Sequence, residues 1–175
     1  MNIFAKALSE RKSIGPKHQI EPGPDSQTLL DAAFAAASAP HHSEVPPFRF
    51  VVVEDRELLA EVFLSNIESP SEEDKEKAIR KAKKGPCLVG LILEKSKDPR
   101  LQLEHAAAAG AGLMNYLHVL NNAGFAAKTV SADDFKDPKG LYDPEREMIL
   151  AWVISGTPDE APEAPQAPIS FWKRS

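Results

Sequence analysis

The residues best suited to bind an anion are Arg11, Lys12 and Ser13, which follow one another directly. An arginine offers a planar fork of N–H donors, a lysine a mobile point charge, and a serine a short hydroxyl donor. Together these side chains could hold a phosphate group. A solvated helix end, with its cations favoured by the helix dipole, is the alternative, and these residues alone leave both open.

The histidines and the single cysteine do not form a recognisable metal or nucleophile site. Cys87 lies in an apolar run, where cysteine usually serves as a small hydrophobic residue. Glu104-His105 lacks the second histidine one turn away that a helical zinc site requires. His41 and His42 are adjacent, so their side chains point in different directions in an extended loop. We therefore expect no metal, and the absence of G-x-S-x-G and P-loop motifs disfavours a hydrolase or a kinase.

Length and composition are those of one ordinary globular domain. The 175 residues are 42% hydrophobic and 27% charged, with a formal net charge of −5. This acidic balance disfavours a nucleic-acid partner, which would require a basic face. The longest stretch without charged residues, 106–127, carries polar side chains that disfavour a membrane span, and a single cysteine suits a reducing cytoplasm.

Apolar spacing, capping residues and breakers predict the elements that must position these side chains. Helices are expected over 2–11, over 27–37 with Asp25 or Ser26 as the cap, over a segment capped by Asp55, over a segment that opens within 69–73 and runs to about residue 84, and over 100–122. Strands are expected over 48–53, 87–93, 125–131 and 148–155. Val51-Val52-Val53 predicts a strand buried on both faces, and residues 133–143 a loop or short helix. Helices first, then strands separated by helices, favour an α+β fold with a small mixed central sheet flanked by helices.

Two further segments bear on assembly. The helix over 100–122 carries Ala106–Ala109, Gly110 and Gly112, small residues that admit a close neighbour. This stripe suits either a dimer interface or the core helix of a monomer, and the sequence leaves both open. Residues 159–175 are rich in proline and end near Phe171 and Trp172, so we expect an extended tail that wraps over a neighbour, such as a second subunit.

Read together, these segments resemble the nitroreductase family over nearly the whole chain, and most closely a short bacterial branch of NAD(P)H nitroreductases. The matching motifs are Arg11-Lys12-Ser13 for R-R-S, Ser38-Ala39-Pro40-His41-His42 for the A-P-x-H loop, Glu104-His105 for E-Q, Ala123-Gly124-Phe125 for A-x-G-x-G, and Ile154–Pro158 for L-G-x-P. Gly124-Phe125-Ala126-Ala127 stands where the family has G-x-G-x. Pro46-Pro47-Phe48 stands where the family has Q-P-W, and Lys128 adds a charge beside the segment matched to the flavin.

The resemblance implies a homodimer that binds FMN at the subunit interface. It also implies ping-pong transfer of hydride from NADH or NADPH, through FMN, to a nitroaromatic, quinone or similar acceptor. The positions matched to FMN ligands are Arg11, Lys12 and Ser13 for the phosphate and ribityl chain, Ser38 and His42 from the other subunit, and Thr129, Val130 and Ser131 along the isoalloxazine ring. The positions matched to the nicotinamide nucleotide are Val119, Leu120, Asn121, Asn122, Ala123 and Gly124. No catalytic side chain is expected, because FMN carries the chemistry.

Two other functions fit the same residues. The first is a flavin- or small-molecule-binding protein on this fold without reductase turnover, since a fold does not determine a reaction. The second is a dimeric interaction module whose C-terminal tail docks on a partner and which binds no flavin.

Overall fold

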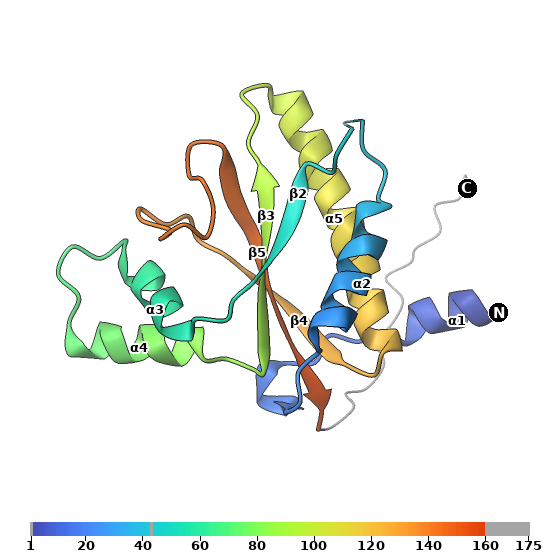
Figure 1. Cartoon of the computed structure of the whole chain (residues 1–175), viewed down its shortest axis with the longest axis horizontal. Coiled ribbons are helices and arrows are strands. Elements are labelled where there is room, and N and C mark those ends of the chain that lie inside the picture. Colours follow the sequence, from blue (N-terminus) through green and yellow to red (C-terminus); the bar gives the residue numbers. More distant parts are fainter. Residues whose placement is uncertain (1, 43, 160–175) are drawn as a thin grey trace, which may run out of the picture.

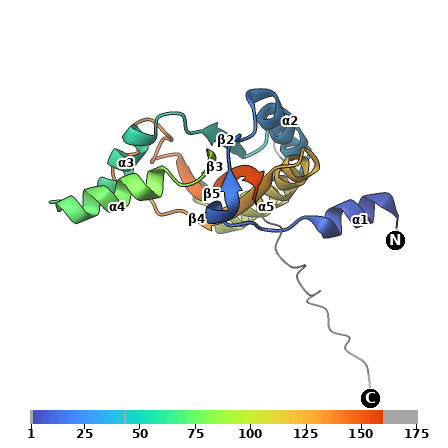
Figure 2. The same ribbon diagram turned by 90° about the horizontal axis from the view of Figure 1, so that it is seen from below.

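A five-stranded sheet lies between two layers of helices (Figures 1 and 2). The structure is a computed structural model that describes residues 2–42 and 44–159. Its elements are α1 (Ile3–Glu10), the short 3-10 helix η1 (Pro16–His18), β1 (Gln19–Ile20), α2 (Ser26–Ala37), β2 (Phe48–Val52), α3 (Arg56–Leu64), α4 (Glu72–Ala82), β3 (Cys87–Glu94), α5 (Pro99–Asn122), β4 (Ala126–Ser131) and β5 (Glu147–Pro158). Helices α2 and α5 cover one face of the sheet, and α3 and α4 cover the other (Figure 2).

Strand β5 is the centre of the sheet. It pairs antiparallel with β3 and with β4, while β2 pairs with β3 and β1 pairs with the last residues of β5. The named strands all pair antiparallel, and the parallel contact among the described residues is an isolated bridge between Ser13 and Ala127. The α+β fold is confirmed, and its sheet is mixed only through that bridge.

Strand β3 carries a core on each side. Its residues from Cys87 to Leu93 are all buried, as their apolar run predicts. Val89 and Leu91 pack in the cluster beneath α2 and α5, whereas Leu88 and Ile92 pack in the cluster beneath α3 and α4. Side chains alternate between the two faces of a strand, so one continuous apolar run supplies both cores.

The predicted helix starts are confirmed by side-chain caps. The Asp25 carboxylate accepts from the Thr28 N–H at 2.8 Å, and the Asp55 carboxylate accepts from two N–H groups of α3. Ser71 and Asp74 form a reciprocal capping box at the start of α4. Gly124 ends α5 with φ of 88°, in the left-handed region that glycine adopts at little cost.

Two expectations differ from the structure. The prediction that Val51-Val52-Val53 is buried on both faces was wrong, because β2 is an edge strand and Val52 is exposed. The last strand continues through residues 156–158, where it pairs with β1, a two-residue strand that local patterns do not reveal. Residues 133–143 form a loop, the first of the two predicted alternatives. The predicted tail falls, except for Asp159, outside the described residues.

Candidate functional site

The segment 11–13 leaves α1 in an extended conformation and runs beside β4. Arg11 has φ of −64° and ψ of 128°, so the helix ends before it. Ser13 pairs in parallel with Ala127, and the Ile14 N–H donates to the Ala127 carbonyl at 3.2 Å. This pairing places the residues matched to the FMN phosphate next to the strand matched to the isoalloxazine ring.

The pairing also decides which groups of β4 face the open edge of the sheet. Because the Ala127 carbonyl points outward to Ile14, the backbone groups of Thr129 and Ser131, two and four residues on, point outward as well. Ala127 belongs to the core beneath α5, and Val130 packs against the opposite core. By alternation, the Thr129 and Ser131 side chains lie on the α5 face of the sheet, whereas Lys128 lies on the other. The Lys128 charge therefore lies on the opposite face from Thr129.

Arg11 lies close to His118 of α5. Burial and the nearby Arg11 guanidinium lower the pKa of the His118 imidazole. The Arg11 Nε atom is buried, and no group among the described residues accepts from it. A bound anion would satisfy that N–H and interact favourably with both side chains. The phosphate of FMN fits this requirement. Sequence reasoning passed over His118 because its neighbour Arg11 is far away along the chain.

The segment 119–124 is the end of α5, which turns directly into β4. The Phe125 N–H donates to the Leu120 carbonyl at 2.9 Å, and the Leu120 side chain is fully buried in the core. Val119 is half-buried against the same core. The exposed part of the predicted nucleotide segment is therefore its end, 122–124.

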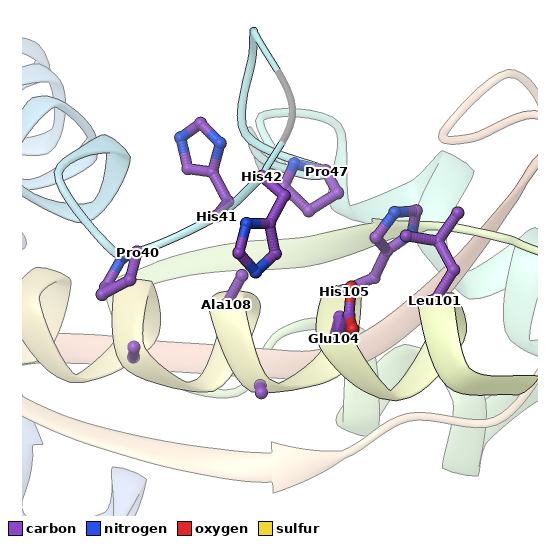
Figure 3. A pocket seen from close by; sticks show the side chains of 10 residues that line it. Pro40, His41, His42, Pro47, Leu101, Glu104, His105 and Ala108 are labelled. Carbon is purple, nitrogen blue, oxygen red and sulfur yellow. The ribbon is translucent and has the colours of Figure 1, made fainter.

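Ser38 and His42 belong to one loop, and the His42 end of that loop lies over the N-terminal half of α5. We call residues 38–42 and 44–47, between α2 and β2, the histidine loop. His42 lines a hollow of about 280 Å³ whose floor is the N-terminal half of α5, including Ala108 (Figure 3). Arg11 instead neighbours His118, in the C-terminal half. Within one chain, the structure thus places His42 and Arg11 at opposite halves of α5.

The hollow contains three imidazoles with different surroundings. His105 is buried, and its Nδ1 lies 3.2 Å from the Glu94 carbonyl oxygen. Since a carbonyl only accepts, Nδ1 is the donor in this contact. The His42 ring lies over Ala108, while the His41 ring points away from α5 (Figure 3). Within residues 2–42 and 44–159, no three His, Cys, Asp or Glu side chains are grouped to hold a metal ion.

Cys87 is a core residue. Its thiol is buried, and burial raises its pKa, so little reactive thiolate forms at neutral pH. The prediction that Cys87 serves as a small hydrophobic residue is confirmed.

The small-residue stripe of α5 divides into an inner and an outer part. Ala108, Ala109 and Gly112 are buried against the rest of the chain. An outer stripe at helical spacing faces away from the body, and we call it the open face of α5: Leu103, Ala107, Gly110, Ala111 and Met114.

Large apolar side chains are exposed on the open face and on two neighbouring helices. Leu103 is 71% exposed, and Phe34 of the adjacent α2 is 77% exposed. Helix α1 projects away from the body (Figure 2), and its Ile3 is 89% exposed. In the described part of the chain, no helix combines the length and apolar character needed to cross a bilayer.

No protein-family model matches the sequence, and no curated protein is significantly similar to it. Solved structures do match. A nitroreductase-like family protein from Bacillus cereus superposes with a TM-score of 0.79 at 18% identity, over 97% of this chain and 92% of that one. An FMN complex from Desulfovibrio desulfuricans, assigned to the nitroreductases, gives a TM-score of 0.69 at 17% identity, over 97% and 94% of the two chains.

Iodotyrosine deiodinase, bound to FMN and 3-iodo-L-tyrosine, also matches, with a TM-score of 0.67 at 19% identity over 99% of this chain and 100% of that one. At such identities the likeness concerns the fold. The described chain has the nitroreductase-like fold, as its sequence resemblance predicts.

Proposed function

We propose that this protein is an FMN-dependent NAD(P)H oxidoreductase that reduces a nitroaromatic, quinone or similar acceptor by a ping-pong mechanism. One observation carries the proposal: the bridge between Ser13 and Ala127 joins two segments, far apart in the sequence, that the family resemblance matches to the same cofactor. Arg11–Ser13 then lies at one end of an open strand edge, with 129–131 beyond it. The FMN complexes among proteins of this fold support the same cofactor.

The phosphate would be held at the start of β4. Arg11 supplies a buried N–H that has no acceptor among the described residues, and Lys12 and Ser13 add a cation and a hydroxyl. His118, whose neutral form is favoured by burial and by Arg11, would gain a favourable interaction with the anion once protonated. These groups orient the cofactor and neutralise its charge.

The ring would lie along the edge of β4. When bound, FMN supplies the hydride chemistry, so the chain needs only to position it and to offer donors to its polar atoms. The outward backbone N–H groups of Thr129 and Ser131 are such donors, because they lie at an edge that β5 does not cover. The exposed end of α5, residues 122–124, is the proposed contact for the nicotinamide nucleotide.

The complete site requires a second copy of the chain. Helix α5 spans residues 99–122, so Gly110 and Ala111 stand at its middle, on its open face. A two-fold axis through this point and perpendicular to α5 would pack two α5 helices closely and antiparallel. The N-terminal half of one helix would then lie beside the C-terminal half of the other. This arrangement brings His42, on the histidine loop of one copy, toward Arg11 of the other. Ser38 begins the same loop, at Asn115.

A flavin- or small-molecule-binding protein without turnover is the second candidate. The similarity to iodotyrosine deiodinase favours keeping it, because proteins of this fold differ in activity. Steady-state kinetics separate the two candidates. The FMN-loaded protein should oxidise NADH or NADPH only when a quinone or nitroaromatic is present, with parallel double-reciprocal lines when both substrates are varied. Stoichiometric FMN binding without such oxidation would favour the binding protein.

A further inference from the structure

Both ends of the histidine loop rest on adjacent turns of α5. The loop begins at Ser38, the C-cap of α2, and leads into Phe48, the first residue of β2. Ser38 contacts Asn115 of α5, and Phe48 lies against Gly112. Since residues three apart on a helix share a face, one short stretch of α5 receives both ends of the loop.

The contact at Asn115 is chemically specific. The Asn115 Nδ2 group donates to the Ala35 carbonyl at 3.1 Å and to the Ser38 hydroxyl oxygen at 3.3 Å. The Ser38 hydroxyl donates its own proton to the Ala35 carbonyl at 2.7 Å. Both oxygens that face Asn115 therefore act as acceptors, and only the amide nitrogen can complete the arrangement.

The contact at Gly112 depends on the absence of a side chain. A Cβ atom there would lie 2.4 Å from Cζ of Phe48 and 3.0 Å from the Ala36 carbonyl oxygen. Only glycine therefore lets the last turn of α2 and the Phe48 ring approach α5 this closely. The loop is consequently held at one end by hydrogen bonds and at the other by close packing.

We infer that Asn115 is a positioning residue for the cofactor site, an inference that rests on the proposed function. It fixes the loop that presents Ser38 and His42 to the cofactor of a second copy. It also determines the role of Ser38, whose only proton is committed to Ala35 and whose oxygen already accepts from Asn115. Ser38 can offer the cofactor one remaining lone pair, so it accepts a hydrogen bond from a hydroxyl of the ribityl chain.

The chain supplies a matched control on the opposite side of the sheet. Asn66 also ties a loop through its side chain, donating to the Asp134 carbonyl at 2.7 Å and accepting from the Lys136 N–H at 2.9 Å. The loop that contains Asp134 and Lys136 belongs to the α3–α4 side, away from the histidine loop. Changing Asn66 therefore removes a comparable loop attachment without touching the histidine loop.

The test compares Asn115→Asp with Asn66→Asp. Each change keeps the side-chain shape and turns a carboxylate oxygen toward a backbone carbonyl. The melting temperature of the FMN-free protein reports the structural cost, and FMN fluorescence titration reports affinity. We expect both variants to melt at lower temperature than the wild type. Asn115→Asp alone should weaken FMN binding, by about tenfold or more, and shift the visible spectrum of the bound flavin toward that of free FMN.

Equal FMN affinities in the two variants, or wild-type affinity in Asn115→Asp, would overturn the inference while leaving the proposed function intact. A wild-type protein that binds no FMN would overturn both. If Asn115→Asp does not fold, Asn115→Ala removes the same two donors without adding a charge, and the same comparison is made with Asn66→Ala.

Discussion

Replacing Gly112 by alanine should destabilise the protein, although alanine is the better helix former. Gly112 lies inside α5, where the change to alanine alone would stabilise the helix by about 1 kcal/mol. The added methyl group, however, would meet the Phe48 ring at 2.4 and 2.8 Å and the Ala36 carbonyl oxygen at 3.0 Å. Carbon atoms in favourable contact lie ~3.5–4.0 Å apart, so the ring or α2 must move.

The expected cost follows from these distances. Overpacking a core typically costs about 1–3 kcal/mol, and overlap with two ring carbons and a backbone oxygen belongs at the upper end. Subtracting the gain in helix propensity leaves a net loss of about 2 kcal/mol. For a chain of this size, that corresponds to a fall in melting temperature of roughly 4–8 °C.

A double-mutant cycle with Phe48→Leu identifies the cause. Thermal or urea unfolding of the FMN-free protein gives the free energy of unfolding for the wild type, both single variants and the double variant. The shorter leucine leaves room for the new methyl group, so the double variant should be more stable than the sum of the single effects predicts, by about 1–2 kcal/mol. A Gly112→Ala variant that melts above the wild type, or additive effects in the cycle, would refute the close-packing argument.

Three further predictions concern the charges and the open face. Arg11→Ala should weaken FMN binding by about 1.5–3 kcal/mol in a fluorescence titration. Lys128→Ala, which removes a cation from the opposite face of β4, should leave FMN affinity unchanged. Equal losses of FMN affinity in the two variants would contradict the phosphate assignment. The methyl group added by Gly110→Ala would meet no atom within 4 Å in one chain, so the variant should raise the melting temperature of a monomer. If Gly110 packs closely on a second copy, the same variant should weaken the dimer in sedimentation experiments. Hydrogen bonding to Arg49 lowers the pKa of Glu147 below the ordinary glutamate value of 4.5. The pair therefore stabilises the folded protein fully at pH values above 4.5, and this stabilisation is lost as the pH falls through the lowered pKa. Glu147→Gln should reduce the acid-induced loss of unfolding free energy by about 1 kcal/mol or less, and an unchanged pH profile would contradict this role.

Sequence-based predictions were most successful where the responsible interactions are local. Asp25, Asp55 and Ser71 cap their helices through bonds to N–H groups two or three residues away, so a short pattern is enough to locate them. The buried strand β3 is likewise predictable from its continuous run of apolar residues. The nitroreductase-like fold followed from landmarks spread over the whole chain, each of which is a short local motif.

Features that depend on distant contacts were not predictable in this way. The two residues of β1 become a strand only because β5 extends to meet them. The outer and inner sides of the small-residue helix could not be separated without knowing that Phe48 lies against Gly112. In the candidate site, the motif Arg11-Lys12-Ser13 was recognisable, but His118 and Asn115 acquire their roles from residues far away along the chain.

The visible absorption spectrum tests the central claim most directly. The purified protein is mixed with FMN, freed of excess cofactor, and then treated anaerobically with NADH or NADPH. Our account predicts that a flavin band is retained and that it bleaches on addition of the nicotinamide nucleotide. A protein that retains no flavin would contradict the assignment of Arg11–Ser13 and 129–131 to FMN, and a retained band that does not bleach would contradict the reductase activity.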